Sequence, residues 1–162
     1  MTIGIIGILA AISVPFFTTA LNNYRLNAAV AAVTGAIAST RYQAIMHGCP
    51  YQLVFTSSTL SYQVSSEVPA TVGATCAASF SAVGGSVPFL SAGPITMSGT
   101  SFTFTFYSNG TVTEVANPAG TGLQIKNLVK SNYVYVSGVG DVTTCQPTSA
   151  CTCNPTTPTV CQ

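Results

Sequence analysis

The sequence has very little charge, no tryptophan and a single histidine. Asp, Glu, Lys and Arg make up 4 % of its 162 residues, whereas an ordinary soluble domain has about 25 %. The formal net charge of +1 gives no basic surface that would attract nucleic acid. The polar surface must come from Ser, Thr, Asn and Gly, and we expect the chain to bind mostly other neutral protein surfaces.

Low charge does not indicate disorder in this chain. Hydrophobic residues make up 48 % of it, and disordered segments are usually poor in apolar residues and rich in charge. The length suffices for one domain of moderate size together with an extended element.

Side chains that perform enzyme chemistry are also scarce. His47 is two residues before Cys49, but a Cys–His nucleophilic pair needs a free thiolate and a third group that orients the base. The three carboxylates, Glu67, Glu114 and Asp141, are scattered, and no glycine-rich phosphate loop is present. We therefore expect no catalytic residue, no cofactor and no metal, and a protein that is not an enzyme.

The cysteines form an even set of six, and four of them lie in the tail "TTCQPTSACTCNPTTPTVCQ". Zinc is the competing interpretation of such a cluster, but zinc sites normally use Cys-x-x-Cys or paired Cys and His. The tail has Cys-x-Cys and no His, so disulfides are favoured, which indicates an oxidising compartment. The residues assigned to disulfides are Cys49, Cys76, Cys145, Cys151, Cys153 and Cys161.

The pairing of these cysteines is not determined by their spacing, because six cysteines allow 15 pairings. We prefer Cys49 with Cys76, since this pair leaves the tail cysteines to bridge among themselves.

The chain opens on an uncharged apolar run, and its first charged residue is Arg25. The run meets the requirement of about 20 apolar residues for a helix that spans a bilayer. A cleavable signal peptide should begin with positive charge, and no such charge is present. The residues assigned to a membrane anchor or filament core are Ile3, Ile5, Ile6, Ile8, Leu9, Ile12, Val14, Pro15, Phe16 and Phe17.

The apolar run continues into an amphipathic pattern. Leu26, Val30, Val33 and Ile37 recur at steps of three and four residues, which predicts a helix that packs this stripe against a sheet. Gly48 is placed to end the helix. Only the second half of such a helix can pack on a globular domain, so the first half must be buried by lipid or by identical neighbours.

The predicted helix covers about residues 2–47, a length of roughly 65–70 Å. Pro15 lacks a backbone donor and clashes with the preceding turn, so we expect a kink there. The sequence leaves open whether Pro15 merely kinks the helix or also makes this its weakest point.

After Gly48 the hydrophobic period changes from 3.6 to 2. "YQLVFTSSTLSYQVSS" predicts a hairpin, "SFTFTFYSNGTVTEV" predicts another with a type I′ turn at Asn109-Gly110, and "GLQIKNLV" with "NYVYVSGVG" predicts a third pair. Residues 66–95 indicate a loop with one short strand at most. Together these patterns predict an α+β fold, with one sheet of roughly six or seven antiparallel strands on the amphipathic half of the helix.

The chain is thus expected to have two parts. These are a hydrophobic anchor or filament-core helix, 1–24, and a globular domain, 25–162, made of helix 25–47, sheet 50–142 and a cysteine-rich tail 143–162.

The stretch "GIIGILAAISVP", residues 4–15, resembles the N-terminal segment of type IV pilins and type II secretion pseudopilins, whose run has the form I-I-G-I-L-A-A-I-A-I-P. In that family the run is first a membrane anchor and then the core of a helical filament. The resemblance implies a pilin fold, and a chain that polymerises with itself and with other pilins. It also implies a location in the inner membrane before assembly, and then in an extracellular pilus on the cell surface or a periplasmic pseudopilus.

The family's mature chain has several more residues before the position of Met1, among them a glutamate that helps to align an incoming subunit. We expect Met1 to be an internal methionine of a longer precursor.

The order of elements is similar to that of GspH/FimT-like minor pilins, and Arg25 and Arg41 occupy that group's two arginine positions in the helix. Some of its members bind DNA through a basic Gly-Arg-x-Arg segment, where this chain has Gly140-Asp141-Val142. Two lysines beside an aspartate do not make a phosphate site, so no nucleic acid is expected.

The expected function is that of a structural subunit of a pilus-like surface filament. The alternative is a minor tip pilin or pseudopilin that acts in filament initiation, adhesion or type II secretion. A secreted enzyme with an uncleaved anchor ranks last, because no catalytic constellation is present.

Overall fold

The computed structural model describes most of the chain, with only the backbone given at 2–15, 114–115 and 122. The described residues are 2–69, 75–89, 94–99, 101–115, 122–148 and 153.

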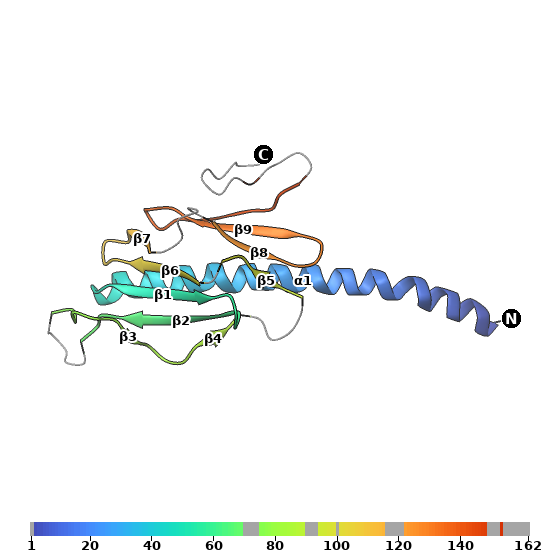
Figure 1. The fold of residues 1–162 in the computed structure, drawn as a ribbon, viewed down its shortest axis with the longest axis horizontal. Helices are drawn as coiled ribbons and strands as arrows, with labels where there is room; N and C mark the ends of the chain where they lie inside the picture. Colours follow the sequence, from blue (N-terminus) through green and yellow to red (C-terminus); the bar gives the residue numbers. More distant parts are fainter. Residues whose placement is uncertain are drawn as a thin grey trace.

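One long helix dominates the molecule. Helix α1 (Thr2–His47) has 46 residues, and Figure 1 shows it as one continuous element that curves gently toward the N-terminus. It continues through Pro15 without interruption. It ends where Gly48 adopts a positive φ of 67°, a backbone conformation that favours glycine after the last helical residue. The expected bounds of the helix are therefore confirmed.

The described strands form two antiparallel sheets that pack against the C-terminal half of α1 (Figure 1). The larger sheet has the order β3-β2-β1-β6-β7, with β4 also paired to β2, and the smaller has the order β10-β9-β8-β5. The larger sheet contains β1 (Tyr51–Thr56), β2 (Ser61–Ser66), β3 (Ser81–Ala82), β4 (Val87–Pro88), β6 (Ser101–Phe106) and β7 (Val112–Val115). The smaller contains β5 (Thr96–Met97), β8 (Gly122–Lys126), β9 (Ser131–Val136) and β10 (Val142–Cys145).

The single sheet expected from the sequence is thus wrong in its organisation, although the α+β class is right. The three predicted hairpins are present as β1–β2, β6–β7 and β8–β9. The hairpins form through local contacts that a period of two reveals, whereas the pairing between hairpins is non-local and leaves no such pattern. The segment 66–95 also holds two short strands, β3 and β4, where one at most was expected. The last strand extends to Cys145, into the segment expected to be tail.

The turn at Asn109-Gly110 also differs from expectation. A type I′ turn needs positive φ at both central residues, but only Gly110 has it, at 81°. The Tyr107 N–H donates to the Thr111 carbonyl at 3.0 Å, and the Gly110 N–H donates to the Tyr107 carbonyl at 2.9 Å. The hairpin therefore closes with a four-residue turn that ends on a left-handed glycine. The β9–β10 turn repeats this pattern at Gly140, whose φ is also 81°.

The core lies between α1 and both sheets. Of the four residues assigned to it, Leu26, Val33 and Ile37 are buried, and Val30 is half-buried and packs against the core. The phenylalanines of β6 that alternate in the sequence all face inward. The largest fully buried side chains are Phe55, Phe102, Phe106, Leu26, Ile37, Leu53, Leu123, Ile125, Val33 and Val134.

Candidate functional site

The N-terminal half of α1 projects beyond both sheets (Figure 1). Phe16 and Phe17 lie at the start of the described side chains of this half and are 82 % and 64 % exposed; Tyr24 is also exposed. The other residues assigned to an anchor or filament core, Ile3 to Pro15, have helical backbone, and their side chains lie outside the described ones. Large apolar side chains in this projection have no cover within the described part of the chain.

Within the residues that the structure describes, no helix has a stretch long and apolar enough to cross a membrane.

The turn between β8 and β9, residues 127–130, lies beside the point where the helix leaves the sheets. The Asn127 side-chain amide donates to the Asn22 carbonyl at 3.1 Å. Its Oδ1 accepts from the N–H groups of Val129 and Lys130 at 2.8 and 2.6 Å. Leu128 and Val129 are left 79 % and 67 % exposed. Asn127 thus fixes both the shape of the turn and its position against α1.

Basic residues cluster at this end of the domain. Lys126 directly precedes the β8–β9 turn and Lys130 is its last residue. Arg25 lies one helical turn beyond Asn22, to which the turn is hydrogen-bonded. The chain has four Lys and Arg residues in all, so this end holds three of them.

The opposite end of the domain carries the fourth, Arg41. Its Nε donates to the Gly110 carbonyl at 3.2 Å, and a Cβ placed on Gly140 would lie 2.6 Å from the same Nε. Glycine at 140 therefore lets the β9–β10 turn approach the guanidinium closely. A guanidinium nitrogen of Arg41 also lies 3.9 Å from a carboxylate oxygen of Asp141. Asp141, which stands where the DNA-binding minor pilins have an arginine, therefore forms an ion pair with the helix.

A groove of about 340 Å³ opens beside Arg41, between the last turns of α1 and the start of β10. We call it the C-terminal groove. Its lining includes Ala38, Arg41, Tyr42, Ile45, Asp141 and Val142. Tyr42 and Ile45 are exposed, so the groove offers apolar surface beside the Asp141 carboxylate.

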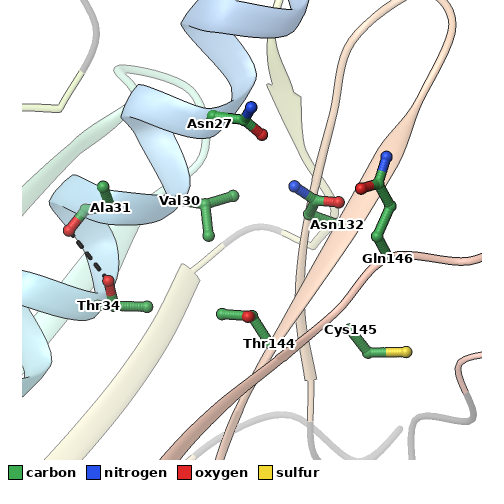
Figure 2. A pocket seen from close by; sticks show the side chains of 8 residues that line it. All are labelled: Asn27, Val30, Ala31, Thr34, Asn132, Thr144, Cys145 and Gln146. Carbon is green, nitrogen blue, oxygen red and sulfur yellow. Dashed lines mark hydrogen bonds between the residues drawn. The ribbon is translucent and has the colours of Figure 1, made fainter. Parts of the chain in front are cut away.

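A second pocket, of about 430 Å³, lies between α1 and the β9–β10 pair. Figure 2 shows side chains from both elements around it, with the Asn132 amide between helix and strand. The Asn132 side chain is buried, and its Oδ1 has no hydrogen-bond partner among the described residues. The lining is neutral, with Asn27, Thr34, Asn132, Thr144 and Gln146 as its polar members.

Two disulfides are present among the described residues. Cys49 is bonded to Cys76, the pair favoured from the sequence, and Cys145 is bonded to Cys153. Cys151 and Cys161 lie outside the described residues. The first bond joins Cys49, two residues after the helix end, to the segment that follows β2. Cys145 of the second bond lines the pocket in Figure 2.

Two tyrosines have perturbed pKa values. Burial raises the pKa of Tyr51, and a hydrogen bond with Ser66 partly offsets this. Burial also raises the pKa of Tyr135, with Tyr133 adding to the increase. In addition, the described residues contain no group of three or more His, Cys, Asp and Glu side chains that could hold a metal ion.

The sequence analysis did not predict that the β8–β9 turn and the C-terminal groove are candidate binding surfaces. The signal for the turn was present, because "NLVK" places two large apolar residues where turns usually carry polar ones. No such signal existed for the groove, whose walls come from segments about 100 residues apart in the chain.

No protein-family model, curated protein or solved structure matches this chain.

Proposed function

We propose that this chain is a structural subunit of a pilus-like helical filament, in the manner of the type IV pilins that residues 4–15 resemble. The observation that carries the proposal is the projection of the N-terminal half of α1 beyond both sheets, with Phe16 and Phe17 exposed. Monomeric soluble proteins rarely expose contiguous apolar surface of this kind. Such a surface needs a cover that the described part of the chain does not provide.

Helices of identical subunits supply that cover in the proposed filament. Burying one large apolar side chain contributes about 1.5–3 kcal/mol, so a run of such side chains in each subunit makes a polymer that dissociates with difficulty. Before assembly the same surface would lie in the inner membrane, and the sheets would face outward. The two disulfides support an oxidising location, because such bonds persist outside the cytosol.

The test is electron microscopy of filaments sheared from the source cells and labelled with an antibody to this chain. We expect label along the whole length. Label only at filament ends would instead indicate the alternative, a minor tip subunit. If filaments carry no label and the protein stays in the envelope fraction, the proposal of a filament subunit is wrong.

A variant adds a second arm to this test. Phe17→Asp places a carboxylate in the proposed core, where burial of an unpaired charge is very costly, so we expect it to abolish labelled filaments. Val83→Asp is the matched control, since Val83 is also an exposed hydrophobic residue but lies between β3 and β4, away from the helix projection. Equal filament numbers in both variants would contradict the proposal.

A further inference from the structure

The two ends of the domain carry surfaces of complementary chemistry, and we propose that the β8–β9 turn of one copy docks in the C-terminal groove of the next. The occupant of the groove is thus a second copy of this chain. This inference rests on the proposed filament and names a contact between its globular domains, outside the helical core.

The β8–β9 turn has the properties of a preformed ligand. Leu128 and Val129 protrude together, and Asn127 holds the turn through its bonds to two backbone N–H groups and to the helix. A segment that is rigid before binding loses little conformational entropy when it docks. The exposed apolar pair would therefore contribute most of its burial to binding.

The C-terminal groove has the complementary properties. It is a concave surface of about 340 Å³ with apolar walls that include Tyr42, Ile45 and Val142. Two aliphatic side chains of the size of Leu128 and Val129 are a chemical match for these walls, because apolar surfaces removed from water together are stabilised.

Charge favours the same pairing. Lys126 and Lys130 flank the protruding pair, and Asp141 lines the groove with its side chain 74 % exposed. The existing contact of Asp141 with Arg41 is 3.9 Å long and solvent-exposed, a kind of pair that holds its partners weakly. The carboxylate can therefore accept a lysine of the incoming turn, and charges arranged in this way fix orientation.

The β8–β9 turn cannot reach the C-terminal groove of its own chain. The turn is bonded to the helix at Asn22 and the groove lies beside Tyr42, which are about 30 Å apart along the helix axis. Figure 1 shows the β8–β9 turn and the C-terminal end of α1 at opposite ends of the sheets. Two different surfaces that pair between copies give a head-to-tail contact, which extends as an open helix when the rotation does not close.

A membrane surface is the competing occupant for the turn, since lysines beside apolar side chains also suit anionic lipid headgroups. A lipid contact would account for the turn but leave the groove unexplained. A second copy accounts for both surfaces with one contact.

The experiment is photo-crosslinking in intact filaments, with a benzoylphenylalanine placed at Leu128 and, as control, at Val83. We expect the Leu128 probe to give dimers and higher multimers, with crosslinked peptides that contain Tyr42, Ile45 or Val142, and the Val83 probe to give none at these sites. Crosslinks from Leu128 to lipid, crosslinks to the projecting helix of a neighbour, or no crosslinks in filaments that are present would each overturn the inference. Absence of filaments from the unmodified chain would instead reject the proposed function.

A charge exchange tests the orientation. We expect Lys130→Glu to reduce the number of filaments at least about threefold, and Lys130→Glu combined with Asp141→Lys to restore it, because a paired reversal recovers the attraction. The thermal midpoint of each purified variant serves to identify variants that fail to fold. Filament numbers that do not respond to Lys130→Glu in a folded variant would overturn the inference.

Discussion

The two halves of α1 are both helical and both rich in apolar residues, yet large apolar side chains are buried under the sheets and exposed where the structure describes them beyond the sheets. Under the sheets, Leu26, Val33 and Ile37 are buried together with small residues such as Ala29 and Ala36. In the projecting half the large apolar side chains that the structure describes are exposed; they are Phe16, Phe17, Leu21 and Tyr24. Alanines let a helix approach a sheet closely, whereas aromatics supply large surface for a partner.

This difference shows that hydrophobicity alone does not determine burial along the helix. The reach of the sheets decides it, because large apolar side chains of the helix are buried under the sheets and exposed beyond them. The predictions below test the contrast between the two halves, and all stability measurements refer to the intact chain in detergent, unfolded with a chemical denaturant.

The largest effect is expected from Ile37→Ala. Ile37 is fully buried, so its truncation leaves a cavity and should lower the free energy of unfolding by about 2–5 kcal/mol. The matched change in the projecting half, Phe17→Ala, should alter it by less than about 0.5 kcal/mol. Similar losses in the two variants would mean that the projecting half packs against the domain.

A somewhat smaller effect is expected from enlarging an alanine under the sheets. Ala36→Leu inserts three carbons where the side chain is buried, and overpacking of this kind costs about 1–3 kcal/mol. Ala31→Leu is the control, because Ala31 is on an exposed face of the same helix. Thermal unfolding of both variants measures the difference, and an unchanged midpoint for Ala36→Leu would show that close approach of the helix is unimportant.

The next effect concerns the boundary between the two halves. Asn127→Ala removes the bond to the Asn22 carbonyl and leaves two N–H groups of the turn without their acceptor, which should cost about 1–3 kcal/mol. Asn109→Ala, in an exposed turn where Asn109 accepts from Thr111, should cost less than about 1 kcal/mol. Denaturant midpoints of the two variants provide the comparison, and equal values would contradict the role given to Asn127.

The smallest expected effect is a decrease in the free energy of unfolding at alkaline pH, caused by two buried tyrosines of the sheets. The folded state raises the pKa values of Tyr51 and Tyr135 above 10.0. The two tyrosines therefore contribute to the free energy of unfolding in full below pH 10. This contribution is lost as the pH rises from there toward the folded-state pKa, because the tyrosines of the unfolded chain lose their protons first. Unfolding free energies measured from pH 8 to 11 should therefore fall above pH 10. Tyr135→Phe should reduce this slope, and an unchanged slope would exclude Tyr135 as its source.

Features with local causes were predictable from the sequence. The bounds of α1 follow from a sustained helical pattern and the glycine at 48, and the three hairpins follow from alternation between turn residues. The inward orientation of Leu26, Val33 and Ile37 follows from the 3.6-residue period.

Features made by distant residues were not predictable. Asn127 and Asn22 are 105 residues apart and Arg41 and Gly110 are 69 apart, and no period in the sequence connects them. The division into two sheets and the C-terminal groove have the same origin. The resemblance to minor pilins singled out Arg41 in the sequence but did not indicate what it contacts. In the structure Arg41 holds the turns at Gly110 and Gly140 against the end of the helix.

The Cys49–Cys76 bond has a mechanical consequence. It joins residues 27 apart in the chain, so a tension applied along the backbone passes through the sulfur atoms and bypasses β1 and β2, which lie between them. At about 3.4 Å per extended residue, roughly 90 Å of contour length is withheld from extension. A subunit pulled from its N-terminal helix can therefore lengthen only through segments outside this loop, and the hairpin that packs against the helix end stays closed under load.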